Sequence, residues 1–217
     1  ICSEDYNKGN DIILVLSARG NETDKLIREI KEINEGVDER ELDMILATGE
    51  QKSVSAMASA FRKTGIPAVS LNAFQVPIHT DSNYGNAKIL GIGKKRIQKE
   101  LSEKKIVIVT GFQGIDKDNN LTTLGRGGSD TTAVALAAKF NADKCEIYKD
   151  VDGVYNNDPK IDMYAKKFDR LEFDEMLELS NSGAKILQNK SIEIAKKYYV
   201  PIFIKSIFTN RVGTLIN

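Results

Sequence analysis

Histidine, cysteine and tryptophan are scarce in this chain of 217 residues, which holds one histidine, two cysteines and no tryptophan. His79 alone cannot build a histidine-based catalytic triad or a multi-histidine metal site, and Cys2 and Cys145 are too isolated for a zinc cluster. Two cysteines are also too few for a disulfide framework, which favours a reducing compartment. We therefore expect no protein-held metal site.

Net charge and long apolar runs are lacking as well. The 31 basic and 31 acidic side chains give zero net charge, so the basic footprint of a nucleic-acid-binding protein is missing. The strongly apolar run at residues 12–16 is far shorter than the ~18 residues of a membrane span. The first residues also lack the basic-then-apolar pattern of a signal peptide. We expect a soluble, cytoplasmic globular protein with no nucleic-acid or membrane partner.

Short β-rich apolar runs alternate with helical stretches along the chain. Residues 12–16 and 106–109 are apolar at every position, which is typical of strands covered on both faces. The alternation predicts an α/β fold with a mostly parallel sheet and helices on both faces. Ligands bind at the carboxyl ends of such strands, so we expect chemistry in the loops after Leu16, Val109 and Tyr148. Further strands are expected at residues 66–71, 145–148 and 201–205, and helices at 24–35, 42–47, 54–62, 97–104, 130–140, 173–179 and 186–196.

Residues 122–130, TTLGRGGSD, form the most glycine-rich segment. Three glycines in four positions let the backbone turn sharply and approach a ligand closely. Ser129 or Asp130 can cap the following helix, whose N-terminal N–H groups would then form an anion site. Arg126 adds a guanidinium suited to a carboxylate or phosphate. A plain glycine-rich loop with a helix cap explains these residues equally well, and no Walker-type G-x-x-x-x-G-K-[ST] pattern occurs.

Residues 148–160 follow a predicted strand and offer cations, carboxylates and tyrosines. One interpretation is a nucleotide edge, with Lys149 and Lys160 toward phosphates and Tyr155 against a base or ribose. The alternative is a surface loop built from Asx and proline turns.

Residues 17–24 also follow a predicted strand. Thr23 and Asp24 could cap the next helix, or the hydroxyls and N–H groups at that end could hold a small carboxylate. Glu50 is an acid in an otherwise apolar helical region, broken around Thr48-Gly49-Glu50. It could receive an ammonium group, although a capping or solvated glutamate fits the local sequence as well.

Together these segments resemble the aspartate kinases of the amino-acid kinase family over nearly the whole chain. The most specific match is TTLGRGGSDTTA at residues 122–133, followed by KDVDGVY at 149–155. Other matches are LSA at 16–18, TDKL at 23–26, RELDM at 40–44, ATGE at 47–50, YGNAKI at 84–89 and GFQG at 111–114.

The resemblance implies a three-layer αβα sandwich, with a mostly parallel central sheet, that transfers a phosphoryl group from MgATP to the side-chain carboxylate of L-aspartate. The product would be 4-phospho-L-aspartate, at the head of lysine, threonine and methionine biosynthesis. An aspartate side chain, with a pKa near ~3.9, is already a nucleophile at neutral pH. Positioning and cations would therefore carry the catalysis, with Mg²⁺ held mainly by the phosphates. We also expect a homo-oligomer.

Roles carry over to this chain by motif. The resemblance implies that Arg126 clamps a carboxylate and that Glu50 receives the α-ammonium. It gives Asp130 and Lys185 catalytic roles, Asp130 in organising the transfer centre and Lys185 in stabilising charge on the phosphates. The implied substrate-binding residues are Ser17, Thr23, Glu50, Arg126, Gly127, Gly128 and Ser129. The implied ATP-binding residues are Lys149, Asp150, Tyr155, Asn156, Asn157, Asp158, Pro159, Lys160, Lys185 and Ile186.

The chain departs from the family pattern in several places. Lys149 stands where many members have threonine, and the usual GAKVLHP-like segment reads GAKILQN at residues 183–189. The K-F-G-G strand and loop that opens the family's catalytic domain is missing, as are the C-terminal ACT regulatory domains. We expect residues 1–217 to be a catalytic domain whose natural form extends further upstream, and the chain alone to be a poor kinase.

Two other functions fit the same residues. One is a kinase for another carboxylate, such as an acetylated amino acid. The other is a non-catalytic amino-acid or nucleotide-binding module of the same fold. A Rossmann-type oxidoreductase is the weakest alternative, because Gly91-Ile92-Gly93-Lys94 lacks the third glycine of the dinucleotide fingerprint.

Overall fold

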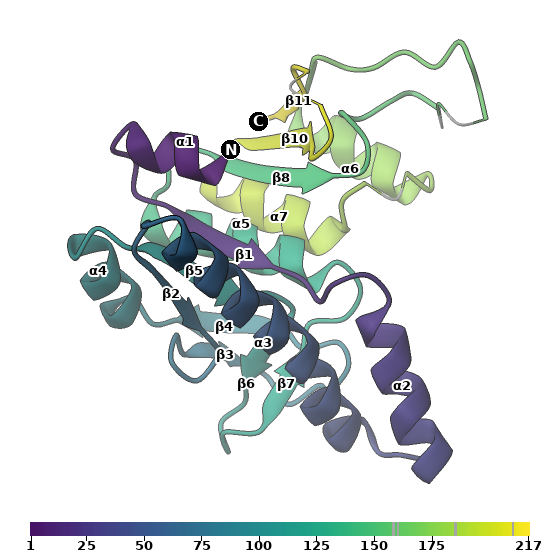
Figure 1. Ribbon diagram of the computed structural model, residues 1–217. Coiled ribbons are helices and arrows are strands. Elements are labelled where there is room, and N and C mark those ends of the chain that lie inside the picture. The colour runs from purple at the N-terminus through teal and green to yellow at the C-terminus, as the bar shows by residue number, and fades with distance from the viewer. Residues whose placement is uncertain (158, 160, 185, 210) are drawn as a thin grey trace. The chain divides into compact units, whose positions relative to one another are not determined.

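The computed structural model describes residues 1–157, 159, 161–184, 186–209 and 211–217. The chain divides into two compact units, Ile1–Thr132 and Ala133–Asn217, and the boundary falls within helix α5 (Gly128–Phe140). Figure 1 shows the elements of both units. No helix in these described ranges is both long and apolar enough to cross a membrane.

The first unit is built on a parallel three-stranded sheet of order β1-β5-β2. Every residue of its central strand β5 is buried, and Ile106 and Ile108 pack with Val54, Ala58 and Phe61 of the long helix α3. Helix α3 thus covers one face of this sheet (Figure 1). The sheet consists of β1 (Ile13–Leu16), β5 (Ile106–Thr110) and β2 (Ala68–Leu71), and the helices of the unit are α1 (Cys2–Asn7), α2 (Glu22–Ile33), α3 (Glu39–Lys63) and α4 (Lys95–Ser102).

A second sheet of the first unit has the order β4-β3-β6-β7. Only the β3–β6 pair is parallel, and the two outer pairs are antiparallel. The sheet consists of β3 (Ile78–Thr80), β4 (Ile89–Ile92), β6 (Gln113–Ile115) and β7 (Leu121–Thr123). Because β7 leads directly into the glycine-rich segment and α5, this sheet anchors the predicted anion loop.

The second unit contains a four-stranded sheet of order β8-β10-β11-β9. Strands β8 and β10 are parallel, β10 and β11 antiparallel, and β11 and β9 parallel. Ile147, Ile202 and Ile204 of this sheet share one buried core with Met176 and Ile192 of the unit's helices. The elements are β8 (Cys145–Lys149), β9 (Arg170–Leu171), α6 (Phe173–Asn181), α7 (Asn189–Tyr198), β10 (Ile202–Ser206) and β11 (Thr214–Ile216).

The predicted α/β class with parallel strand pairing is confirmed, but several element boundaries differ from the expected ones. The expected break at residues 48–50 does not exist, because α3 runs without interruption for 25 residues. Gly49 is tolerated inside it because a Cβ there would lie 2.9 Å from Cβ of Ala18, so the missing side chain allows the β1–α2 loop to approach. The helix expected at 24–35 begins earlier, at Glu22.

Candidate active site

The carboxyl ends of β1 and β5 meet the N-terminus of α5 in the first unit. Leu16 pairs with Thr110 at the strand ends, and the N–H of Gly111 donates to the carbonyl of Leu16 at 3.0 Å. A Cβ on Gly111 would lie 2.5 Å from Oγ of Ser129, so this glycine lets the α5 N-terminus sit against the end of β5. Ser17 follows Leu16 and is exposed. The structure therefore brings the predicted substrate residues Ser17 and Ser129 to one end of the parallel sheet.

The glycine-rich loop has the backbone that its composition predicts. Gly125 and Gly127 adopt φ values of +78° and +71°, which favour glycine. Gly128 begins α5, and a Cβ there would lie 2.9 Å from the ring of Phe112. Arg126 is exposed, and its guanidinium has no hydrogen bond or ion pair within the described part of the chain. A bound anion could therefore use all of its donors.

The cap predicted for α5 was wrong. The helix begins at Gly128, so Ser129 and Asp130 are its second and third residues and lie in the first turn. An acidic group in the first turn stabilises a helix through its dipole. Asp130 is half-buried there, and its catalytic role stays a prediction.

Glu50 is a buried carboxylate on α3, only 3% exposed. Its Oε1 accepts the N–H of Ala18 at 2.9 Å, whereas its Oε2 has no partner among the described residues. Burial raises the pKa of Glu50 to about 7, and the Ala18 hydrogen bond opposes that rise. The alternative of a capping or solvated glutamate is therefore wrong. The free Oε2 and the neighbouring Ser17-Ala18 loop suit a cationic ligand group.

Thr23 lies in the first turn of α2, at the end of the loop that carries Ser17. The helix starts at Glu22 with Asn21 as its N-cap residue, so neither Thr23 nor Asp24 is the cap. The start of α2 packs on α3, where Glu22 forms an ion pair with Lys52. Thr23 is half-buried in this first turn.

In the second unit, the predicted nucleotide residues follow β8. Tyr155 donates its phenol proton to Oδ1 of Asp152 at 2.6 Å, and this bond is the main reason that the pKa of Asp152 is lowered and that of Tyr155 raised. Oδ2 of Asp152 lies 3.8 Å from Nζ of Lys167 and 3.7 Å from the Arg211 guanidinium. The tyrosine is thus held by a carboxylate surrounded by cations.

Tyr155, Asn156 and Asn157 are paired with residues further along the chain. Tyr155 pairs with Lys167, and Asn156 exchanges two hydrogen bonds with the backbone of Lys166, at 3.1 Å and 2.7 Å. Asn157 donates to Asp162 at 3.2 Å. These contacts hold residues 155–157 against residues 162–167, and the nucleotide role of this segment stays a prediction.

The remaining predicted nucleotide residues are spread over other parts of the second unit. Lys149 is the last residue of β8, and its carbonyl accepts the N–H of Ile207 at 3.0 Å. Asp150 and Pro159 are exposed. Ile186 packs against the hydrophobic core of the second unit. Three predicted residues, Asp158, Lys160 and Lys185, lie outside the described residues.

The sequence did not single out several buried polar groups of the first unit. Asp43 on α3 and Gln113 on β6 are both buried and hydrogen-bonded. Asp116 holds the β6–β7 turn by accepting the N–H groups of Asp118 and Asn120. Burial acts to raise its pKa, but these N–H groups and its side-chain donors outweigh burial and lower the pKa to about 2. Asp43 does fall in the RELDM match at residues 40–44, and that match was the available signal.

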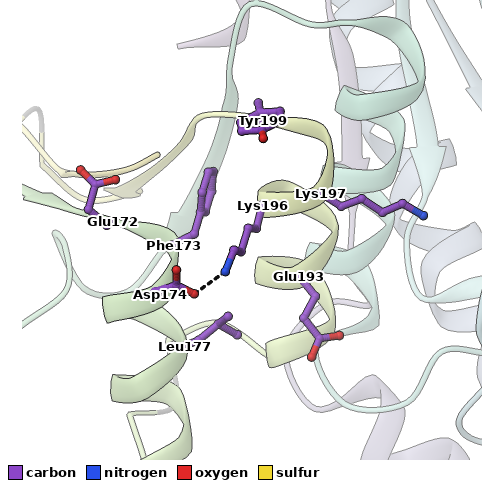
Figure 2. A pocket seen from close by; sticks show the side chains of 8 residues that line it. All are labelled: Glu172, Phe173, Asp174, Leu177, Glu193, Lys196, Lys197 and Tyr199. Atoms are coloured by element: carbon purple, nitrogen blue, oxygen red, sulfur yellow. Dashed lines mark hydrogen bonds and ion pairs between the residues drawn. The ribbon is translucent and has the colours of Figure 1, made fainter.

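A groove of about 590 Å³ lies between α6 and α7 in the second unit (Figure 2). The ion pair of Lys196 with Asp174 bridges it, and none of the predicted site residues lines it. In the described ranges no group of three or more His, Cys, Asp or Glu side chains could hold a metal ion.

Comparison with known proteins gives the class of this protein. The profile of the Amino acid kinase family matches residues 1–206, so the chain belongs to that family. It is 47% identical over 213 residues to an aspartokinase of Geobacillus stearothermophilus, covering 98% of this chain and 52% of the relative. The chain thus spans about half the length of the curated relatives it matches.

Solved structures give the same picture. Aspartate kinase from Synechocystis superposes with a TM-score of 0.87 at 38% identity, covering 99% of this chain and 35% of the other. Aspartokinase III of E. coli in complex with aspartate and ADP superposes with a TM-score of 0.75 at 27% identity, covering 92% and 47%. The particular proteins that this chain resembles are therefore aspartate kinases.

Proposed function

We propose that residues 1–217 act as the catalytic domain of an aspartate kinase. A side-chain carboxylate oxygen of L-aspartate attacks the γ-phosphorus of ATP, the bond from that phosphorus to the β–γ bridging oxygen breaks, and ADP leaves with 4-phospho-L-aspartate as the other product. The similarity to curated aspartokinases supports this assignment. In this proposal the reaction opens lysine, threonine and methionine biosynthesis in the cytoplasm, and the protein works as a homo-oligomer.

The observation that carries the proposal is the unpartnered Oε2 of Glu50 in the same unit as the exposed guanidinium of Arg126. The two groups are complementary to the α-ammonium and a carboxylate of one amino acid. Ser17, Thr23, Gly127 and Ser129 would supply further donors from the β1–α2 segment and the start of α5. Gly128, whose N–H already donates to the carbonyl of Gly125, would line the same site. A charge-assisted bond of this kind contributes about 1.5–3 kcal/mol, which is enough to orient a small substrate.

The nucleotide is assigned to the second unit. Lys149, Lys160 and Lys185 would face the phosphates, and Tyr155 would pack against the base or ribose. We further assign Asp130 to the organisation of the transfer centre and Lys185 to the charge that develops on the phosphates. In this proposal Mg²⁺ arrives with ATP and is held mainly by its phosphates.

The test is ATP turnover by the natural gene product with L-aspartate, N-acetyl-aspartate and N-acetyl-glutamate, with the acyl phosphate trapped by hydroxylamine. We expect hydroxamate from aspartate alone, because Glu50 requires a free ammonium group. Turnover of an acetylated substrate would support the alternative carboxylate kinase. ATP binding in calorimetry without turnover of any acceptor would support a non-catalytic binding module.

A further inference from the structure

One face of α3 contacts each of the loops that carry the proposed aspartate-binding residues. Asp43, Ala47 and Glu50 occupy positions i, i+4 and i+7, which lie on the same side of a helix. Glu50 accepts from Ala18 in the β1–α2 loop, and the carbonyl of Ala47 accepts from Nε2 of Gln113 at 2.9 Å. Asp43 contacts the segment that leads to Arg126.

Asp43 is 1% exposed and fully hydrogen-bonded. Its Oδ2 accepts the N–H of Thr123 at 2.7 Å and the N–H of Gly85 at 2.9 Å, and its Oδ1 accepts the Thr123 hydroxyl at 2.6 Å. An ionised carboxylate makes short, strong bonds with such donors. A buried carboxylate that loses its hydrogen bonds is costly, so any movement of Thr123 or Gly85 away from Asp43 is opposed. The three bonds therefore fix the positions of Thr123 and Gly85 relative to α3.

The two backbone partners of Asp43, Thr123 and Gly85, lie close to Gly125, the residue that precedes Arg126. Thr123 ends β7, two residues before Gly125. A Cβ on Gly125 would lie 3.0 Å from the carbonyl oxygen of Gly85, so Gly125 packs directly against the turn that Asp43 holds. The backbone entering Arg126 is therefore fixed on two sides by one carboxylate of α3.

We infer that Asp43 is a positioning residue that sets the separation between the Glu50 carboxylate and the Arg126 guanidinium. The helix between Asp43 and Glu50 is a rigid rod with a rise of about 10 Å. One end holds the proposed ammonium-binding carboxylate and the other holds the backbone of the proposed carboxylate clamp. Asp43 thereby sets the length of amino acid that the site accepts. This inference rests on the proposed roles of Glu50 and Arg126.

The test compares two substitutions of Asp43 in the natural gene product. Asp43→Ala removes all three bonds. Asp43→Asn can retain them, because its amide oxygen can accept both N–H groups while its NH2 donates to the Thr123 hydroxyl. The assays measure kcat and KM for aspartate, KM for ATP, and the ratio of kcat/KM for aspartate to that for glutamate, which is one methylene longer.

We expect Asp43→Ala to raise KM for aspartate by about tenfold to a hundredfold, since a displacement of about 1 Å in a site can cost a factor of ~10². KM for ATP should stay within about twofold, because ATP is assigned to the other unit, and the aspartate-to-glutamate ratio should fall by about tenfold. Asp43→Asn should keep KM for aspartate and the aspartate-to-glutamate ratio close to those of the unmodified protein.

Glu100→Gln is the matched control, because Glu100 is a 4% exposed carboxylate on α4 that pairs with Arg96 and Lys105 and contacts none of these loops through its carboxylate. It should lower stability without changing the substrate ratio. If Asp43→Ala is unfolded, Thr123→Val deletes the hydroxyl bond alone and should lower the aspartate-to-glutamate ratio in a folded protein.

An unchanged aspartate-to-glutamate ratio in folded Asp43 and Thr123 variants would overturn the inference, as would equal effects on both KM values. Failure of the proposed function gives a different result, since the unmodified protein would then form no aspartyl phosphate at all, and both conclusions would fall together.

Discussion

Replacing Glu50 by glutamine should make the protein more stable above pH 7 while impairing its use of aspartate. Glutamine has the size of a protonated glutamate and can keep the bond from the Ala18 N–H to its carbonyl oxygen. It cannot ionise, so the variant avoids the cost of a buried charge with an unpartnered oxygen. The same change removes the charge opposite the proposed ammonium group.

The magnitude follows from the pKa of Glu50, which burial raises from 4.5 to about 7. In that interval the folded protein binds more protons than the unfolded chain, so the free energy of unfolding falls as pH rises from about 4.5 to about 7 and then levels off. At about 1.36 kcal/mol per pKa unit, the ionised form destabilises the fold by about 3 kcal/mol. The glutamine variant should match the unmodified protein near pH 4.5 and exceed it by up to this amount above pH 7.

Aspartate binding should depend on the same proton. An ammonium ligand favours the ionised form of Glu50, so the protein must lose a proton to bind aspartate below pH 7. With a pKa of about 7, the ionised fraction rises about tenfold between pH 6 and pH 8. Affinity for aspartate should increase about tenfold over that range in the unmodified protein, and the glutamine variant should bind weakly with no such pH dependence.

The assay is urea unfolding and aspartate calorimetry of both proteins between pH 5 and pH 8.5. Glu100→Gln supplies a control of opposite sign, because the hydrogen bond from Lys105 is the main reason that the pKa of Glu100 is lowered. Its carboxylate stabilises the fold above the unfolded pKa, so its loss should destabilise the protein at neutral pH. A stability difference between the unmodified protein and the Glu50→Gln variant that does not change with pH would refute the reasoning.

Three further predictions concern other parts of the site. Arg126→Ala should raise KM for aspartate by an amount worth about 1.5–3 kcal/mol and leave KM for ATP unchanged, because the exposed guanidinium bonds to nothing else in the described structure. Steady-state kinetics measures both KM values, and an unaltered KM for aspartate would contradict the proposed role of Arg126 as a carboxylate clamp. Gly49→Ala should destabilise the fold by about 1–3 kcal/mol in thermal unfolding, since its Cβ would meet that of Ala18 at 2.9 Å, and equal stability would show that the loop gives way. Tyr155→Phe removes the 2.6 Å hydrogen bond to Asp152 and should weaken ATP binding, measured by calorimetry, without changing aspartate binding. An unchanged affinity for ATP would show that this hydrogen bond has only a structural role.

The sequence predicted the elements whose signal is local and strong. Uniformly apolar residues 12–16 and 106–109 do form neighbouring parallel strands. The clustered glycines at 125–128 do form a sharply turned loop at a helix N-terminus. The loop follows from the backbone freedom of glycine, and the apolar composition of β5 matches its complete burial. The burial on both faces expected for residues 12–16 was wrong, because β1 is an outer strand of its sheet and all of its residues are half-buried.

The features that sequence could not predict depend on partners far along the chain. Asp43 bonds to Thr123, 80 residues away, and the local sequence gives no reason to bury it. Gly49 looks like a helix break until the contact with Ala18 is known. The three-residue strand β6 (Gln113–Ile115) is too short to show a period of two.

The helix α3, which the sequence analysis divided in two, contains three residues that are unfavourable in a helix or in a buried position. Between Asp43 and Glu50, α3 contains a buried carboxylate, a glycine that costs about 1 kcal/mol relative to alanine in a helix, and a second buried carboxylate that is only half satisfied. A helix selected for stability alone would have apolar residues or alanine at all three positions. Local rules are broken together where a fold gives up stability for a site. Asp43 and Gly49 have partners within the fold, so the half-satisfied carboxylate of Glu50 is the feature that supports, independently of any sequence match, a ligand site on α3.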